Sequence, residues 1–166
     1  MRVGENKKSA FKRLAKRHQF ILKIVGAGRD IKIPGVDIIN QPWSLEREVS
    51  DYQDLDIGIY PLEGNEWDLG KTGFKTVVYM SVGTPAVVSN AGSNKEIIKD
   101  GINGFLANTN EEWFAKLSIL IRNPRLRYNV GKAARDTVIK SYSVRANFAK
   151  YIDIFNKVLE SKHAKS

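Results

Sequence analysis

The chain has 166 residues, the length of one ordinary domain, and its 42% hydrophobic and 27% charged residues exclude wholesale disorder. It has no Cys and only two His, so disulfide scaffolds and zinc–thiolate sites are excluded, and the composition argues against a His-based metal centre or catalytic triad. No apolar run approaches the roughly 20 residues of a membrane span and no secretory signal opens the chain, so we expect a cytoplasmic protein.

The net charge of +9 is distributed unevenly along the chain. Residues 1–32 hold ten Lys or Arg against two Asp or Glu, residues 33–112 hold five against thirteen, and residues 113–166 hold twelve against three. A nucleic-acid binder needs one continuous basic face, so we expect no specific nucleic-acid partner. Solvated basic helices are the simplest interpretation. Contact of the basic ends with the inner face of a membrane, or with an acidic partner, stays open.

The first half of the chain alternates between predicted helices and strands. Apolar residues at helical spacing over 5–18 predict a basic helix within residues 1–19. The apolar, β-branched run FILKIVG at 20–26 predicts a buried parallel strand, and VDII at 36–39 and LDIGIYP at 55–61 predict two further strands. Ser44 is expected to cap a short helix over 45–53, and the polar residues 62–70 are expected to form a loop.

The second half continues the alternation and ends in helices. An apolar helix over 73–83, closed by Gly83, leads to the strand PAVVS at 85–89. Capping-box patterns begin at Ser93 and Thr109, the first opening a helix that ends at Gly101. The remaining elements are a strand at 104–108, a helix carrying Trp113, Leu117, Leu120 and Ile121, a helix from Pro124 to about 140, and a last helix from Ser143 that buries Phe148, Ile152, Phe155 and Leu159.

This order predicts an α/β fold, a Rossmann-like α/β/α sandwich with a mostly parallel sheet. We expect one domain over 1–166, with a basic helix at 1–19, alternating elements over 20–108 and C-terminal helices over 109–166. Ligands of such sheets bind at the carboxyl ends of strands. A doubly wound domain normally opens with its central strand, whereas this chain opens with a helix. The domain therefore lacks its usual first strand, and either it is truncated or something else fills that place in the sheet.

The segment 66–85 carries the clearest chemical signal. Gly70-Lys71-Thr72-Gly73 leads from the polar loop into the start of a helix, and Lys75 shares a helical face with Lys71. Free N–H groups at a helix start, close-approach glycines and two lysines make a site for an anion such as a diphosphate. It is not a P-loop, because no glycine lies five residues before Gly70. Two solvated lysines on a surface helix are the competing interpretation, which composition alone favours.

Two further turns follow predicted strands. Asn90-Ala91-Gly92-Ser93 ends the strand next to the 70–75 turn, so both helix starts can face one ligand. Gly26-Ala27-Gly28 lies where a dinucleotide fingerprint would, but its third glycine is absent because position 31 is Ile. A tight turn after a strand explains that motif equally well.

The stretch DIGIYPLEGNEWDLGKTGFKTVVYMSVGTPAVVSNAGSNKEIIKDGINGFLA, residues 56–107, resembles a known family. A strand ending in Pro, then Gly-Phe, Tyr-Met, Gly-x-Pro-x-Val, a Glu before Asp-Gly, and Asn-Gly-Phe-Leu follow one another as in the C-terminal, donor-binding domain of GT-B type glycosyltransferases of group 1. The resemblance covers about residues 20–160. It implies transfer of a sugar from a nucleotide-sugar with retention of anomeric configuration, the nucleotide lying between two Rossmann-like domains.

The resemblance also implies which residues bind the donor. The residues expected beside the base and ribose are Gly26, Gly28, Arg29, Gln41 and Trp43. Those expected beside the diphosphate and sugar are Gly70, Lys71, Thr72, Gly73, Lys75, Asn90, Gly92 and Ser93. Glu66 and Asp68 can contact sugar hydroxyls, although solvated loop acids are the simpler interpretation. No metal or other cofactor is expected, because the lysines already supply positive charge.

The sequence departs from the family pattern in two ways. The usual glutamate pair is replaced by Gly70 and Val78, so no catalytic residue is assigned and the role of diphosphate ligand passes to Lys71 and Lys75. The N-terminal, acceptor-binding domain is absent, so we expect the chain to need it as a partner and to be inactive alone. A non-catalytic interaction module using the basic ends is the alternative. A phosphate-handling hydrolase has little support, since Ser93 has no His to serve it.

Overall fold

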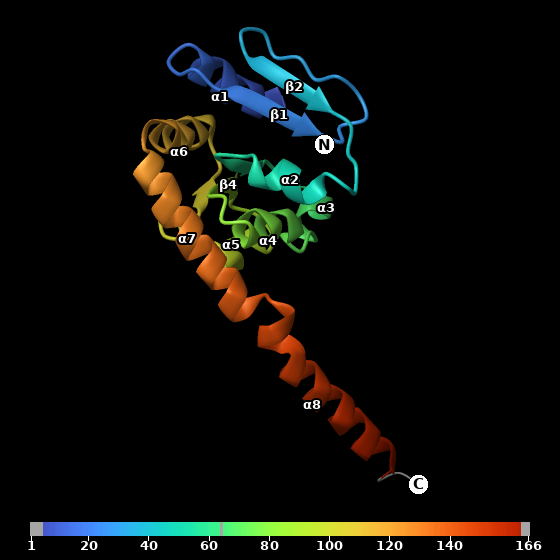
Figure 1. The fold of residues 1–166 in the computed structure, drawn as a ribbon. Helices are drawn as coiled ribbons and strands as arrows, with labels where there is room; N and C mark the ends of the chain where they lie inside the picture. The colour runs from blue at the N-terminus through green and yellow to red at the C-terminus, as the bar shows by residue number, and fades with distance from the viewer. Residues whose placement is uncertain (1–4, 64, 164–166) are drawn as a thin grey trace.

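The computed structural model describes residues 5–63 and 65–163 (Figure 1). The strands are β1 (Ile21–Val25), β2 (Asp37–Gln41), β3 (Gly58–Tyr60), β4 (Ala86–Ser89) and β5 (Phe105–Ala107). The helices are α1 (Glu5–Ala15), α2 (Glu48–Gln53), α3 (Glu66–Leu69), α4 (Phe74–Ser81), α5 (Asn94–Ile97), α6 (Asn110–Arg122), α7 (Pro124–Ser141) and α8 (Val144–His163). The predicted alternation and α/β class are confirmed.

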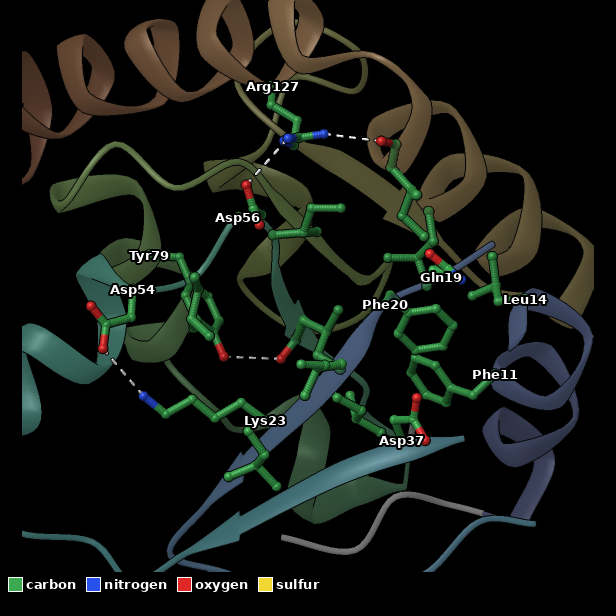
Figure 2. Close-up of a pocket in the computed structure, with 18 residues that line it drawn as sticks. Phe11, Leu14, Gln19, Phe20, Lys23, Asp37, Asp54, Asp56, Tyr79 and Arg127 are labelled. Carbon is green, nitrogen blue, oxygen red and sulfur yellow. Dashed lines mark hydrogen bonds and ion pairs between the residues drawn. The ribbon is translucent and has the colours of Figure 1, made fainter. Parts of the chain in front are cut away.

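The strands pair in parallel, as predicted, but in two separate sheets. β1 pairs with β2 from Ile21↔Asp37 to Val25↔Gln41. The other sheet has the order β3-β4-β5. An open cleft of about 830 Å³ lies between the two sheets and is lined by residues of β1, β2 and β3 (Figure 2). The described strands therefore form two small parallel sheets with the cleft between them.

Two apolar clusters cover the opposite faces of the three-stranded sheet. Side chains alternate along a strand, so Val87 of β4 enters one cluster and Val88 the other. The first cluster contains side chains of α1 and α6 together with Leu22 and Ile24 of β1. The second contains side chains of α4 and α7. Helices thus cover both faces of the sheet, as in an α/β/α sandwich.

Strand β1 is less buried than predicted. Leu22 and Ile24 are buried, but Ile21 is 63% exposed, and Ile39 of β2, which pairs with Lys23, is 47% exposed. The run of apolar residues therefore belongs to a strand with only one covered face. Among the described strands β1 pairs only with β2, and residues of both strands line the cleft.

Several predicted helix ends are wrong in detail. Ser44 does not cap α2: its hydroxyl donates to Glu46, and α2 begins three residues later than expected, with Arg47 as N-cap. Ser93 precedes α5 without a side-chain cap bond, because its hydroxyl donates to the Lys71 carbonyl instead. The same helix ends at Ile97, so Gly101 does not close it.

The helix starts at Thr109 and Gly73 agree with the prediction, and the segment 62–70 differs from it. The Thr109 capping box is formed with Glu112 and opens α6. The expected loop over 62–70 contains the short helix α3, capped by the Asn65 side chain, which accepts from the backbone N–H of Asp68. Gly73 precedes α4 with φ +68°, a conformation that favours glycine.

The C-terminal helix departs most from expectation. Phe148, Ile152, Phe155 and Leu159 were predicted to be buried, yet they are 42–61% exposed. α8 extends away from the body of the molecule beyond α7 (Figure 1). Among the described helices and strands, α8 packs to a notable extent only against α7. None of the helices in the described residues is long and apolar enough to span a membrane.

Candidate functional site: a lysine-bearing turn and its neighbour

The turns before α4 and α5 are packed directly against one another. A Cβ added at Gly92 would lie 3.2 Å from the carbonyl oxygens of Asp68 and Leu69 and 3.3 Å from that of Lys71. A Cβ added at Gly73 would lie 2.5 Å from Ile97 Cδ1 and 3.7 Å from Ser93 Cβ. The structure thus brings together the two turns that were predicted to face one ligand.

Buried polar side chains fix the positions of these turns from below. The Thr76 hydroxyl of α4 donates to Asn94 Oδ1 of α5 at 2.7 Å, and Asn94 Nδ2 donates to the Ser89 carbonyl at 3.0 Å. The Ser89 hydroxyl in turn bonds the backbone N–H and carbonyl of Leu62. Thr76 and Asn94 are at most 1% exposed. Because a buried polar group is costly unless paired, this chain of hydrogen bonds holds the ends of β3 and β4 in one arrangement.

Lys71 is oriented by Asp68, which the sequence suggested to be a solvated loop acid. Asp68 is only 5% exposed, accepts from the backbone N–H of Glu63 at 2.7 Å and pairs with Lys71 Nζ at 2.5 Å. The hydrogen bond from Lys71 to Asp68 raises the pKa of the lysine, so Lys71 is charged at neutral pH. Asp68 is therefore a buried organiser of the turn rather than a solvated loop acid. The spacing of three residues between Asp68 and Lys71 was the sign in the sequence that the two side chains could pair.

Lys75 is the second cation at this site. It is half-buried, and its ammonium lies 5.8 Å from the ring centroid of Tyr60, a residue of β3 that sequence reasoning did not select. None of the ion pairs recorded for the described residues involves Lys75. Burial, and then the charge of Lys71, lower its pKa. Two mutually repelling lysines at the start of α4 make a site that favours an anion.

A second group forms at the ends of β1 and β2. Gly26 has φ +71°, and its N–H donates to the Gln41 carbonyl at 2.9 Å. A Cβ at Gly26 would lie 3.1 Å from Trp43 Cβ, so the backbone there passes close to the indole. Trp43 is 56% exposed, which leaves its ring surface open to a planar ligand. The structure therefore brings Gly26 beside Trp43 at the ends of β1 and β2.

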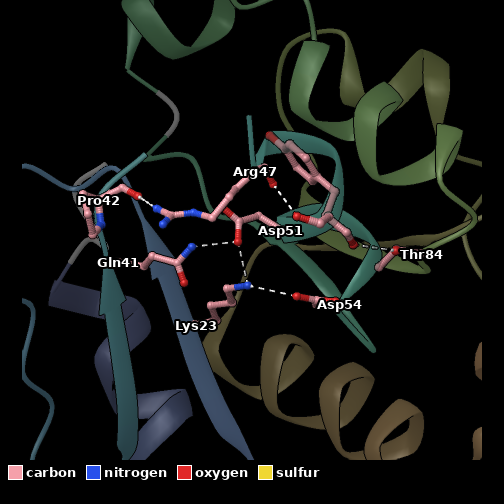
Figure 3. Close-up of polar contacts among 9 residues, drawn as sticks. Lys23, Gln41, Pro42, Arg47, Asp51, Asp54 and Thr84 are labelled. Atoms are coloured by element: carbon pink, nitrogen blue, oxygen red, sulfur yellow. Dashed lines mark hydrogen bonds and ion pairs between the residues drawn. The ribbon is translucent and has the colours of Figure 1, made fainter. Parts of the chain in front are cut away.

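Gln41 is placed differently from the other residues of this group. Its side-chain amide donates to Asp51 Oδ1 at 2.8 Å, and Lys23 Nζ donates to the same oxygen at 2.8 Å (Figure 3). Asp51 is 8% exposed, and the hydrogen bond from Lys23 holds the pKa of its carboxyl below the ordinary value. The Gln41 side chain thus ties β2 to α2 and β1.

The remaining predicted residues have few partners. Gly28 and Arg29 are exposed, and Arg29 lines a small hollow with Lys8 and Lys32. Thr72 is exposed, and the backbone N–H of Asn90 donates to the Ala107 carbonyl at 3.4 Å. Among the described residues, no hydrogen bond or ion pair joins the Gly26–Trp43 group, at the ends of β1 and β2, to the turn that carries Lys71 and Lys75. Within the described residues no cluster of acidic or His side chains could hold a metal ion.

Comparison with known proteins identifies the class to which this arrangement belongs. The family model described as glycosyl transferases group 1 matches residues 8–123. Because the match spans more than half of the chain, the chain belongs to the group 1 glycosyltransferases. The expected family is confirmed.

Individual relatives agree with this assignment. The chain is 26% identical over 137 residues to a trehalose synthase of Pyrococcus horikoshii, a match covering 82% of this chain but only 31% of that protein. It thus spans about a third of the length of that curated relative.

Solved structures agree in fold. A crystal structure of the C-terminal domain of a group 1 glycosyl transferase (LpcC) from Francisella tularensis aligns with TM-score 0.51 and 18% identity, covering 85% of this chain and 95% of that one. Staphylococcus aureus TarM, in complex with Fondaparinux, alpha-GlcNAc-glycerol and UDP, aligns with TM-score 0.69 and 16% identity over 93% of this chain and 34% of its own. The fold is that of a GT-B C-terminal domain.

Proposed function

We propose that this chain is the donor-binding half of a retaining glycosyltransferase, which binds the diphosphate of a nucleotide-sugar at the turns 70–75 and 90–93. The single observation that carries the proposal is the pair Lys71 and Lys75 at the start of α4, packed against the Gly92–Ser93 turn. Lys75 has no carboxylate partner among the described residues, so its charge is available to a ligand.

The geometry supports recognition of a phosphate group. For the N–H groups of Phe74, Lys75 and Thr76, the first of α4, no acceptor is recorded among the described residues. Such N–H groups at the positive end of a helix dipole bind anions. Gly73, with φ +68°, sets the turn so that a ligand can approach the backbone closely. Positive charge here would stabilise a departing nucleoside diphosphate without a divalent metal.

We propose that the Gly26–Trp43 group binds the base and ribose. The exposed indole of Trp43 offers a stacking surface, and Gly28 and Arg29 closely follow Gly26 in sequence. The Gln41 side chain acts indirectly, by holding β2 against α2 through Asp51. Asp68 also acts indirectly. It forms an ion pair with Lys71 and accepts a hydrogen bond from the backbone N–H of Glu63, and so fixes the position of that lysine.

We further propose that the chain is inactive by itself. Transfer requires the acceptor to be held beside the donor, and the positions of the family's glutamate pair are occupied here by Gly70 and Val78. An acceptor-binding domain would complete the cleft and supply the remaining contacts. The structure of TarM, which is similar in fold to this chain, was solved in complex with UDP. UDP is therefore the first nucleotide to test.

Titration calorimetry with UDP, GDP and ADP tests the proposal. We expect saturable binding of one of them. Lys71→Ala and Lys75→Ala should each weaken it by about 1–3 kcal/mol, the usual range for a lost hydrogen bond to a charged group. The matched control is Lys95→Ala, because Lys95 is an exposed lysine of α5 that is not part of the turn. Equal affinities of all three variants and the unaltered chain would show that the anion site is elsewhere.

A non-catalytic interaction module is the second candidate, favoured by the exposed apolar side chains of α8 and the basic ends. It predicts binding to vesicles of anionic lipid that weakens steeply between low and high salt, with no affinity for nucleotides. Nucleotide binding lost in the lysine variants would count against this candidate.

A further inference from the structure

An exposed apolar surface lies beside the lysine-bearing turn and has no part in binding a diphosphate. Trp67 of α3 is 81% exposed, whereas Trp113 is 1% exposed. Leu69 and Phe74, which stand on either side of Lys71 in the sequence, are exposed as well. Removing apolar surface from water is favourable, and exposed apolar patches bordered by polar residues mark binding sites. Among the described residues the fold gives the indole at position 67 little to pack against.

The backbone that carries Trp67 is firmly held. The Asn65 side chain accepts from the backbone N–H of Asp68 at 2.9 Å, and the Asn65 carbonyl accepts from that of Leu69 at 3.0 Å. The Asp68 carboxylate is buried and accepts from the backbone N–H of Glu63. An indole has only two side-chain torsions, so binding against a fixed backbone costs little conformational entropy. Trp67 thus offers an exposed aromatic plane on a rigid turn.

The same turn sets Trp67 beside Lys71. The backbone N–H of Gly70 donates to the Glu66 carbonyl at 3.2 Å, so the chain stays helical from α3 to Gly70. Residues three and four apart in a helical turn share a face, which places Gly70 and Lys71 next to Trp67. Gly70 has no side chain, and a Cβ added there would meet no atom of a non-adjacent residue nearer than 3.7 Å. The surface between the indole and Lys71 is therefore open to a ligand.

Charge is divided across this part of the site. Lys71 and Lys75 belong to the turn and to the start of α4, whereas Glu63 and Glu66, just before and in α3, are exposed acids. After the hydrogen bond to Asp68, the charge of Glu63 is among the causes that raise the pKa of Lys71, so the two groups are close. A ligand whose diphosphate lies at the lysines therefore brings its next group to an aromatic plane bordered by carboxylates.

A neutral hexose has the chemistry that matches these groups. The C–H bonds on one face of its ring carry partial positive charge, so that face packs on the electron-rich face of an indole. Its hydroxyls donate hydrogen bonds to carboxylates. A uronic acid in the same place would bring its own carboxylate toward Glu63 and Glu66, and like charges repel.

We propose that Trp67 is the platform on which the hexose of the nucleotide-sugar stacks, and that this position selects neutral hexoses over uronic acids. The inference rests on the proposed diphosphate site at the 70–75 turn and adds a sugar position to it. Loss of the indole should weaken binding of the nucleotide-sugar and leave that of the nucleoside diphosphate unchanged. One aromatic contact of this kind changes a dissociation constant by about 3–10-fold.

A lipid surface is the other partner that exposed Trp, Leu and Phe side chains can bind. A loop that inserts into a bilayer turns its lysines outward, to the headgroups. Here Lys75 is half-buried near the ring of Tyr60, and Lys71 is paired with the buried Asp68. Both cations are thus directed toward the turn itself, which favours a small anionic ligand.

Titration calorimetry of the full chain compares UDP, UDP-glucose and UDP-glucuronic acid, or the matching compounds of GDP or ADP if one of those binds instead. The unaltered chain should bind UDP-glucuronic acid at least about 3-fold more weakly than UDP-glucose. Trp67→Ala should raise the dissociation constant of UDP-glucose by about 3–10-fold and that of UDP by less than about twofold. Trp67→Phe keeps an aromatic ring and should recover most of the lost affinity. Tyr128→Ala, the matched control, removes an exposed aromatic side chain of α7 and should change neither constant.

NMR of the three indole N–H groups gives a readout that a change in stability does not mimic. The variants Trp43→Phe and Trp67→Phe assign two of the signals, and the third belongs to Trp113. UDP-glucose should shift the Trp67 signal of the unaltered chain, and UDP should leave it nearly unchanged. The buried Trp113 serves as the internal reference.

The outcomes separate this inference from the proposed function. If no nucleotide binds, the proposed diphosphate site is wrong and the sugar platform falls with it. If UDP binds and Trp67→Ala weakens UDP and UDP-glucose equally, or neither, the diphosphate site stands and the platform is overturned. Equal affinity for UDP-glucose and UDP-glucuronic acid would overturn the selectivity. Loss of binding to phosphatidylserine vesicles in Trp67→Ala, with UDP-glucose bound as before, would assign the exposed side chains to a lipid surface instead.

Discussion

Gly73→Ala is the most informative single substitution at the paired turns. Gly73 is the N-cap of α4, with φ +68°, and it is buried against α5. The added methyl group would lie 2.5 Å from Ile97 Cδ1 and 3.3 Å from Asn94 Oδ1. The substitution therefore strains the backbone and pushes apart the two helix starts on which the proposed diphosphate site is built.

The cost follows from these two effects. The left-handed conformation costs an L-residue about 1–2 kcal/mol. Moving Ile97, which is 5% exposed, off its preferred rotamer costs about 0.5–1.5 kcal/mol more. The lower entropy of the unfolded alanine chain returns about 0.4–1 kcal/mol. The free energy of unfolding should fall by about 0.5–3 kcal/mol, which lowers Tm by about 1–12 °C in a chain of this length.

Thermal and urea unfolding of Gly73→Ala and of Gly70→Ala measure the difference. Gly70 is the matched control because its φ is −77° and an added Cβ would have no neighbour nearer than 3.7 Å. Gly70→Ala should leave stability unchanged or raise it slightly. If Gly73→Ala proves as stable as Gly70→Ala, the packing of the two turns described above is wrong.

Three other substitutions or conditions have definite expected outcomes. Gly131→Ala should lower the free energy of unfolding by about 1–3 kcal/mol or more in urea titrations, because its Cβ would lie 2.0 Å from the Gly83 carbonyl and would force α7 away from α4. Acid should destabilise the fold. The pKa of Asp51 is held low by its hydrogen bond from Lys23, so this stabilisation is complete above the unfolded pKa of about 3.9 and is lost as pH falls through the folded value. Asp51→Asn should therefore flatten the dependence of Tm on pH between about 2 and 5. Phe148→Ser should change the free energy of unfolding by no more than about 0.5 kcal/mol, since Phe148 is 60% exposed, and a large loss would show that α8 packs on the body of the molecule.

Local signals predicted those parts of the fold that depend on neighbouring residues. The Thr109 capping box, Pro124 at the start of α7 and the glycines at 73 and 83 mark real helix boundaries. Each acts through hydrogen bonds or backbone conformation within one turn, so a single sequence is enough to reveal it.

Predictions that depend on distant partners failed. Ser93 has a capping-box pattern, but the Lys71 carbonyl, 22 residues away, takes its hydroxyl. The heptad-like spacing of Phe148, Ile152 and Phe155 predicts an apolar face, and that face exists, but the described residues leave it uncovered. Periodicity reveals that a face is apolar and not what covers it.

At the candidate site, too, local features were predicted and contacts with distant residues were not. The sequence selected Lys71 and Lys75 because of their spacing and their place after glycines. It did not reveal that Asp68 is buried and holds Lys71, or that Tyr60 lies beneath Lys75. Both facts depend on the end of β3 lying beside the turn, which only the fold decides.

The central claim is that the turns at 70–75 and 90–93 form one site for the diphosphate of a nucleotide. It is tested most directly by NMR titration of the full chain with UDP, GDP and ADP, following the backbone amides. The account predicts that one nucleotide shifts the amides of Gly70 to Lys75 and of Gly92 and Ser93 along a single saturable curve, and that Lys75→Ala weakens the effect. Saturable shifts confined to other parts of the chain, with these amides unmoved, would contradict it.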